Sequence, residues 1–333
     1  MPTLSTPPRA RQQRRPLFRE LRPRFIPSPG TPGEGQGGGL NVWNAFRLGM
    51  QLKTSSDGSI SGTLSKLVKL APQPVKLSRA LAPIDFVRWR EFDFALRAAS
   101  HFMSSPGQVL DLSSPKLLPL TIASKVRGCH VVATDILDRE VNWVRSAGDR
   151  LGLMNLTARV EDARQLRFPD NRFDLITSVS VIEHIAPEHG GEIPAMREIA
   201  RVLAPGGIAV ITVPFSRSYF ADYHTGNVYE RENTNGEPIF FQRFYDQGML
   251  MSNIVAASGL ELASLGFIEE RLCWKDPHKR VAHYVNGSPM QNFFCGPFYP
   301  LLSRIFLSAP KPLDGCTKPY LACIVLRKVT APA

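Results

Sequence analysis

The sequence contains few cysteines, and they are not arranged as a metal site or a disulfide framework. Its 333 residues include five cysteines, an odd number, with no Cys-x-x-Cys pair and no Cys/His ligand cluster. Unpaired cysteines are typical of proteins in a reducing compartment. We therefore expect a cytoplasmic protein without a bound metal ion.

Long hydrophobic runs are also missing. No stretch of 18 apolar residues is present, and no apolar segment follows the charged N-terminus, so the sequence predicts neither a membrane span nor a secretory signal. The first predicted strand, at residues 109–112, is not followed by Gly-x-Gly-x-x-Gly. This absence argues against a nicotinamide-dependent oxidoreductase.

Acidic residues are scarce at the start of the chain. The whole chain has 40 Lys and Arg against 29 Asp and Glu, a net charge of +11, and residues 1–40 contain seven Arg and two Glu among many Pro and Gly. Because this segment has too few apolar side chains to fold, we predict a disordered tail. The tail is either a low-complexity segment or a contact for anionic partners. A nucleic-acid-modifying enzyme is disfavoured, since the chain has no Asn-Pro-Pro-Tyr or Pro-Cys motif.

Helical and strand patterns alternate from residue 84 onwards, after a poorly defined segment at residues 41–83. The predicted strands lie at residues 109–112, 130–135, 157–160, 173–178, 208–213, 260–267 and 320–329. The predicted helices lie at residues 84–100, 117–126, 139–151, 193–203 and 246–258. This alternation predicts a doubly wound α/β fold, with a mostly parallel, Rossmann-like seven-stranded sheet and helices on both faces.

Two connections are unusually long for such a fold. Residues 214–244 are polar and follow the fifth predicted strand, so we expect there either a loop that meets the substrate, called here the acceptor-side loop, or a solvated loop. Residues 270–319 are rich in proline, aromatic and basic residues and are expected to form an insertion or cap. The apolar part of this insertion, residues 293–307, is either a peripheral membrane or lipid contact or a cap that packs over the core.

Acidic residues stand at the carboxyl ends of three predicted strands. Asp111 ends the first strand, Asp135 ends the second, and Glu161 and Asp162 follow the third. Ligands of open parallel sheets bind beyond these strand ends. A carboxylate at the end of the second strand is placed to accept hydrogen bonds from both ribose hydroxyls of a nucleoside cofactor. The acid after the third strand can reach an adenine amino group.

Five motifs in this order resemble the class I S-adenosylmethionine-dependent methyltransferases of the type 11 group, over roughly residues 108–215. The motifs are Val-Leu-Asp-Leu at 109–112, Ala-Thr-Asp at 133–135, Glu-Asp-Ala at 161–163, Phe-Asp-Leu-Ile-Thr-Ser-Val-Ser-Val-Ile-Glu-His-Ile at 173–185 and Arg-Val-Leu-Ala-Pro-Gly-Gly at 201–207. The resemblance implies a methyltransferase domain at residues 84–333, an antiparallel last strand and S-adenosylmethionine as the cofactor. The cofactor-binding residues that it implies are Asp111, Ser113, Ser114, Asp135, Ile136, Asp162, Ala163 and Ser178.

The first cofactor loop departs from the family pattern Asp-x-Gly-x-Gly-x-Gly. The three glycine positions hold Ser113, Pro115 and Leu117. Side chains at these positions narrow the cleft and disfavour a positive φ. Ser113 and Ser114 can still donate hydrogen bonds, and Pro115 suits the first turn of the helix that follows. We interpret the loop as a variant that still binds the cofactor.

Glu183 and His184 follow the fourth strand, and the resemblance places them toward the methyl group of the cofactor. A neutral His184, with an ordinary imidazole pKa near 6.5, could accept a proton from a substrate hydroxyl or amine; the alternative is a packing or turn-capping role. The sequence thus predicts a methyltransferase acting on a small molecule or on an intermediate of lipid or glycan synthesis. The rival interpretation is a non-catalytic binding module with this fold that has lost the cofactor.

Overall fold

A computed structural model describes residues 40–54, 83–102, 107–272 and 294–330. The predicted tail at residues 1–39 and most of the two segments at 41–83 and 270–293 therefore lie outside the described residues. None of the described helices is both long enough and apolar enough to span a bilayer.

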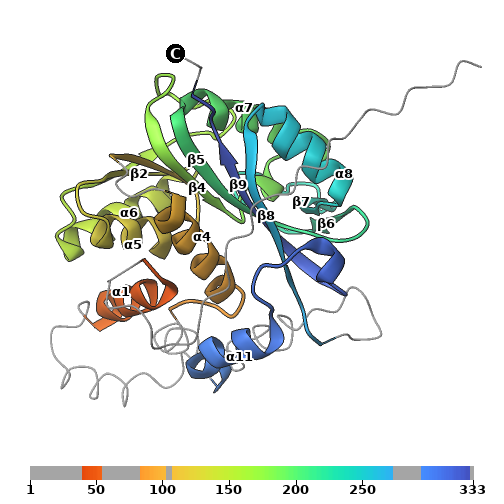
Figure 1. The fold of residues 1–333 in the computed structure, drawn as a ribbon, viewed down its shortest axis with the longest axis horizontal. Helices are drawn as coiled ribbons and strands as arrows, with labels where there is room; N and C mark the ends of the chain where they lie inside the picture. Colours follow the sequence, from red (N-terminus) through yellow and green to blue (C-terminus); the bar gives the residue numbers. More distant parts are fainter. Residues whose placement is uncertain (1–39, 55–82, 103–106, 273–293, 331–333) are drawn as a thin grey trace, which may run out of the picture.

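The centre of the protein is a seven-stranded sheet with the order β3-β2-β1-β4-β5-β9-β8 (Figure 1). The strands are β1 (Gln108–Leu112), β2 (His130–Asp135), β3 (Leu156–Val160), β4 (Phe173–Val179), β5 (Leu203–Pro214), β8 (Glu261–Glu269) and β9 (Pro319–Arg327). The first five strands pair in parallel, and β9 runs antiparallel to both β5 and β8. The predicted fold class and the antiparallel last strand are confirmed.

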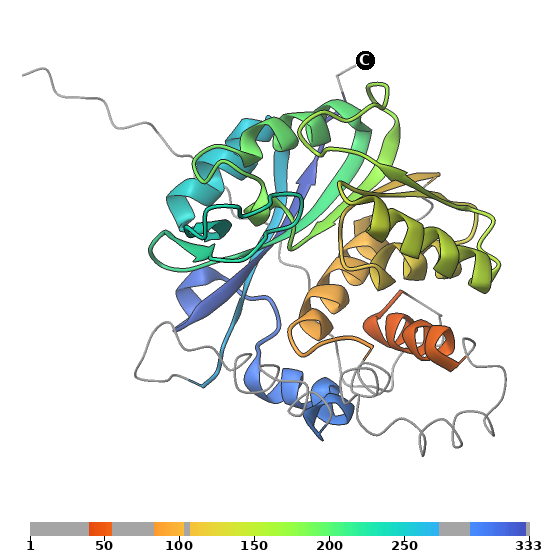
Figure 2. The ribbon, with the colours of Figure 1, turned by 180° about the vertical axis from the view of Figure 1, so that it is seen from behind.

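Helices cover both faces of the sheet, as Figures 1 and 2 show from opposite sides. Consecutive strand residues point to opposite faces, so Val109 joins the core beneath α4 (Arg88–Phe102) and α5 (Leu117–Lys125), while Leu110 joins the core beneath α7 (Glu192–Val202). A further helix, α6 (Asp138–Leu151), packs on β2 and β3. Burial on both faces explains why the strands read as continuous apolar runs.

A helix forms at the start of the segment for which the sequence shows no clear period. It is α1 (Val42–Thr54), and it packs on α4 and α5. Ala45 is fully buried in the same core as α4, and Leu48 belongs to the same buried cluster as Leu120 of α5. The hydrophobic layer of the domain therefore begins before residue 84.

The Pro-Gly-Gly motif lies inside a strand rather than before one. β5 starts at Leu203 and includes Gly206 and Gly207. Gly206 has a φ of 80°, and a Cβ on Gly207 would lie 2.8 Å from the carbonyl oxygen of Ala204. Glycine is required at both positions, because one needs the left-handed region and the other a close backbone approach. The pairing of β5 with β4 shifts register at this point.

The predicted acceptor-side loop contains a small second sheet. β6 (Phe220–His224) and β7 (Ile239–Phe244) pair antiparallel, so residues 214–244 are not a loop throughout. Phe220 and Phe244 stack with ring centroids 4.2 Å apart, and such cross-strand aromatic pairs stabilise a short hairpin. This hairpin packs against the turn that follows β4.

The helix predicted at residues 246–258 is present but irregular. The side chain of Asp246 accepts a hydrogen bond from the Met249 amide at 2.8 Å and so caps the helix. The short α8 (Gln247–Met249) continues as a π-helix, η3 (Leu250–Ala256). In the late insertion the described elements are η4 (Gly296–Phe298), α11 (Tyr299–Phe306) and η5 (Leu313–Gly315).

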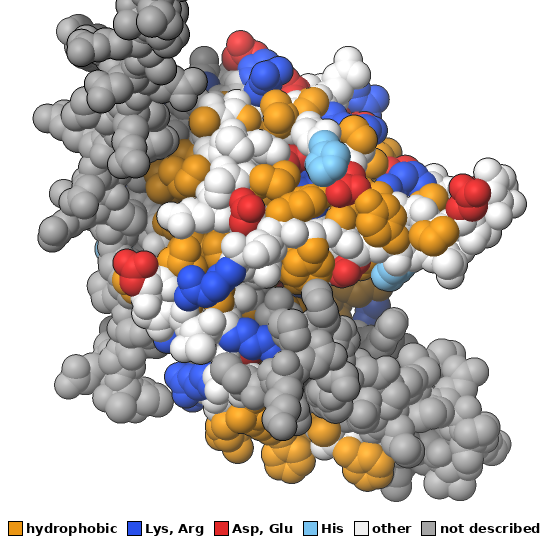
Figure 3. Space-filling view, turned by 90° about the vertical axis from the view of Figure 1, so that its right-hand side faces the viewer, with side chains coloured by type: hydrophobic (Ala, Val, Ile, Leu, Met, Phe, Trp, Pro, Cys, Tyr) orange, Lys and Arg blue, Asp and Glu red, His pale blue; other side chains and the backbone are white. Residues whose placement is uncertain are grey.

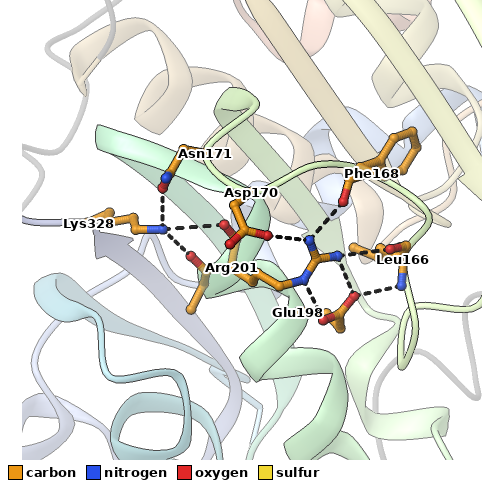
Figure 4. A network of polar contacts seen from close by, with 8 residues as sticks. Leu166, Phe168, Asp170, Asn171, Glu198, Arg201 and Lys328 are labelled. Atoms are coloured by element: carbon orange, nitrogen blue, oxygen red, sulfur yellow. Dashed lines mark hydrogen bonds and ion pairs between the residues drawn. The ribbon is translucent and has the colours of Figure 1, made fainter.

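The arginine of the Arg-Val-Leu-Ala-Pro-Gly-Gly motif fastens the segment between β3 and β4 (Figure 4). Arg201, at the end of α7, donates to the carbonyl oxygens of Leu166 at 2.9 Å and Phe168 at 2.8 Å. Its guanidinium also pairs with Asp170 and Glu198. The motif therefore has a structural role at the edge of the sheet opposite the strand ends that carry the predicted site.

Candidate functional site

A cavity of about 280 Å³ lies at the carboxyl ends of β1 to β4. Such a crevice is where an open α/β sheet binds its ligand. The predicted site residues that line it are Ser113, Asp135, Ile136, Asp162, Ala163 and His184. Residues far apart in the sequence are thus brought together, because the ends of neighbouring parallel strands meet at one edge of the sheet.

Four predicted residues are buried and do not line this cavity: Asp111, Ser114, Ser178 and Glu183. Asp111 accepts hydrogen bonds from the Thr177 hydroxyl at 2.6 Å and from the Ser114 amide at 3.2 Å. Burial raises the pKa of Asp111 to about 6, against the effect of these two bonds. The Ser114 hydroxyl accepts from the Val179 amide at 3.0 Å. Asp111 and Ser114 therefore tie the first loop to β4, and their contact with a cofactor stays a prediction.

Ser113 takes the backbone conformation that a glycine would have at its position. Its φ is 54°, in the left-handed region, and its amide donates to the Thr134 carbonyl at 2.9 Å. The first turn of the loop is therefore kept without glycine, at a cost in backbone strain. Pro115 then leads into α5, where its carbonyl accepts from the Leu118 amide.

Asp135 presents its carboxylate at the end of β2, as predicted. One oxygen accepts from the Leu137 amide at 3.0 Å, and the other accepts from the ammonium group of Lys116. Lys116 also lies 3.9 Å from Glu140. The Lys116 contact could not be predicted from the sequence, because Lys116 occupies a position of the loop motif where the family has no fixed residue.

Asp162 is paired with a neighbour on its own turn. Arg164 donates to its two carboxylate oxygens at distances from 2.7 to 3.1 Å, and these hydrogen bonds lower the pKa of the Asp162 carboxyl. Ala163 stands beside it on the cavity wall. Asp162 is therefore a charged carboxylate at neutral pH, and Arg164 lines the same cavity.

His184 is held in one tautomer. Its Nδ1 lies 2.9 Å from the carbonyl oxygen of Phe241 in β7; a carbonyl can only accept, so Nδ1 carries the proton and Nε2 the free lone pair. Burial lowers the pKa of His184 to about 4, although the bond to Phe241 opposes this. The ring also contacts those of Tyr229 and Phe241, with centroids 5.0 and 4.8 Å away. His184 is therefore a neutral proton acceptor at physiological pH.

Glu183 is a buried acid beside this histidine. Only 1% of its surface is exposed, and burial raises the pKa of its carboxyl to about 8. Its Oε1 lies 3.7 Å from Nε2 of His184, too far for a hydrogen bond. At neutral pH both groups are uncharged, so the pair is not an ion pair.

Arg243 of β7 clamps the turn that carries His184. Its guanidinium donates to the carbonyl oxygens of Ile185 and Pro187, at 2.5 and 2.7 Å, and pairs with Glu192 at the start of α7. Arg243 and Glu192 are both fully buried, so each neutralises a charge that would otherwise be costly. The small second sheet therefore supplies both Phe241 and Arg243 to position His184, which the sequence did not predict.

Helix α4 adds a second polar group at the end of β4. Its Glu91 is fully buried and accepts from the Ser180 hydroxyl at 2.5 Å and the Thr212 hydroxyl at 3.0 Å, and it pairs with Arg88. A second cavity of about 310 Å³ lies between α1, α4 and α5, with Arg88 in its wall. Lys116 lines both cavities.

Residues 116–211 match a family model described as a methyltransferase domain, of type 11. A phosphatidylethanolamine N-methyltransferase of Cereibacter sphaeroides is 29% identical over 145 residues, which cover 40% of this chain and 67% of that protein. The uncharacterized protein YafE of Escherichia coli is 34% identical over 82 residues, 24% of this chain and 37% of that protein.

Among solved structures, coclaurine N-methyltransferase, bound to N-methylheliamine and SAH, is similar with a TM-score of 0.49 and 12% identity, over 89% of this chain and 90% of that one. The family match spans four of the five sequence motifs described above in whole or in large part. It confirms the resemblance that they indicate: residues 116–211 match the type 11 methyltransferase domain, and the cofactor is S-adenosylmethionine.

Proposed function

We propose that this protein transfers a methyl group from S-adenosylmethionine to a small molecule or to an intermediate of lipid or glycan synthesis. The observation that carries the proposal is the convergence of Asp135, Asp162 and His184 on one cavity at the strand ends. The first two are carboxylates placed for a nucleoside, and the third is a proton acceptor.

The residues of the cavity fit this cofactor. Each carboxylate oxygen has more than one acceptor site, so Asp135 can bind ribose hydroxyls while it keeps its bonds to Leu137 and Lys116. Ile136 and Ala163 supply apolar wall on either side of the acids. The positive φ of Ser113 keeps the first loop in the turn that glycine gives elsewhere in the family.

Bound S-adenosylmethionine would supply a methyl group whose carbon is the electrophile, with the positively charged sulfur leaving as a neutral thioether. The chain supplies a place for the proton that the acceptor loses. Because Nε2 of His184 is unprotonated above about pH 4, it can receive this proton as the attacking atom bonds to carbon and becomes acidic. The neutral Glu183 adds no negative charge that would hold that proton on the histidine.

A lipid acceptor is supported by one comparison. The matched protein of Cereibacter sphaeroides acts, by its name, on phosphatidylethanolamine, an amine on a lipid. The apolar wall of the second cavity, which includes Leu52, Phe92 and Trp143, would accept part of an aliphatic acceptor.

Calorimetry with S-adenosylmethionine and with its demethylated product tests the proposal. We expect saturable binding of both by the full chain, weakened in Asp135→Ala and unchanged in Asp149→Ala, which alters an exposed acid on α6. Transfer of a labelled methyl group to lipid or small-molecule extracts then identifies the acceptor class. Absence of cofactor binding by a folded chain would favour the alternative, a binding module that has lost its cofactor.

A further inference from the structure

The solvent-facing side of α11 is apolar. Phe298, just before the helix, and Leu301 and Ile305 within it are spaced three and four residues apart, so they lie on one face. Their surfaces are 58%, 56% and 47% exposed, whereas Tyr299 and Ser303 on the opposite face are buried. Phe294, which precedes η4, is 65% exposed. Large side chains of this kind gathered on one exposed helix face mark an interaction surface rather than scattered surface residues.

Arginines gather around the same helix. Arg304 is exposed on α11 itself, Arg90 donates to the Leu307 carbonyl at 3.0 Å, and the Arg271 amide donates to the Phe306 carbonyl at 2.8 Å. Burial, together with the charges of Arg271, Arg304 and Arg97, lowers the pKa of Arg90. Residues 294–311 contain no acidic residue. Figure 3 shows the hydrophobic side chains along the lower edge of the protein, at the level of α11 in Figure 1, with Lys and Arg side chains above them.

We propose that this face of α11 docks on an anionic lipid bilayer. The three apolar side chains enter the boundary between headgroups and acyl chains, and the exposed guanidinium groups of Arg271 and Arg304 contact lipid phosphates. Apolar area and basic charge act together in such interfacial helices, because neither alone holds a protein firmly on a bilayer. Anionic headgroups complement the arginines, whereas a second copy of this chain would bring like charges together.

The docking helix packs on the α4 segment, which also lines the second cavity. Phe86, in the turn before that helix, lies 6.3 Å from Tyr299 and 6.4 Å from Phe306 between ring centroids. Arg88, two residues later, lines the second cavity. The docking proposal itself does not depend on methyl transfer.

Vesicle flotation with the full chain tests the docking. We expect binding to vesicles of phosphatidylcholine with 25% phosphatidylglycerol, and binding at least about tenfold weaker to phosphatidylcholine alone. The double variant Leu301→Glu, Ile305→Glu and the single variant Arg304→Glu should each lower binding to the anionic vesicles by about tenfold or more.

The controls place the same changes elsewhere on the surface. Met154→Glu replaces a side chain that is 94% exposed on the turn between α6 and β3, and Arg197→Glu reverses an exposed charge on α7; both should bind as the wild type does. Circular dichroism melting confirms that each variant is folded. Equal binding by the α11 variants and the controls would overturn the proposal, as would sedimentation that shows a dimer dissociated by Leu301→Glu without any vesicle binding.

Discussion

Replacing Glu183 by glutamine should change how the stability of the protein depends on pH. In the folded protein burial raises the pKa of this carboxyl from about 4.5 to about 8. Between these values the folded chain keeps a proton that the unfolded chain has released, so the free energy of unfolding falls as pH rises. The loss is about 1.4 kcal/mol for each pH unit, hence about 4 kcal/mol between pH 5 and pH 8. Glutamine has nearly the same shape and does not ionise, so Glu183→Gln should not show this loss.

Urea unfolding followed by circular dichroism at pH 5, 6, 7 and 8 measures the effect. We expect the stability of Glu183→Gln relative to wild type to increase steadily over this range. Other groups that titrate there, such as Asp111 with its pKa of about 6, cancel in the difference between the two proteins. Glu237→Gln, at an exposed glutamate, should give parallel curves. A constant difference between Glu183→Gln and wild type at every pH would refute the assignment of a protonated Glu183.

Three further predictions concern two cavity residues, Asp135 and His184, and the clamp formed by Arg243 and Glu192. Asp135→Ala should weaken cofactor binding by about 1–3 kcal/mol in calorimetry, and unchanged affinity would contradict the ribose contact. His184→Ala should lower turnover by about 10²–10⁴-fold with nearly constant cofactor affinity. The wild-type rate should fall on the acid side near pH 4, and this fall should disappear in the variant. A normal rate in the variant would indicate a packing role. Arg243→Met should lower the free energy of unfolding by about 3–5 kcal/mol, since it leaves Glu192 buried without its partner, and adding Glu192→Gln should restore much of it; a chemical denaturation series that shows no such rescue would argue against the clamp.

The central sheet, and the strand ends at which the site lies, could be predicted because both depend on short patterns of neighbouring residues. Buried parallel strands are continuous apolar runs, and the acids that end them are visible in the sequence, as with Asp135 after His-Val-Val-Ala-Thr. The strand order of a doubly wound sheet brings the ends of β2 and β4 to the same edge, and Asp135 and His184 therefore converge on one cavity. The hairpin within residues 214–244 was missed, since its strands are short and separated by a polar, Asn-rich segment.

The chemical state of the predicted base was not accessible from the sequence, for two physical reasons. An ordinary imidazole would titrate near pH 6.5, but burial, which depends on packing by β7 and the loop before it, lowers the pKa of His184 to about 4. The group that selects its tautomer is the backbone carbonyl of Phe241, 57 residues away. Every residue type has a backbone carbonyl, so no pattern of side chains in the sequence predicts this hydrogen bond. The position of this carbonyl nevertheless depends on one specific side chain. Arg243 lies two residues further along the same strand and pairs with Glu192, so it holds β7 against the turn that carries His184.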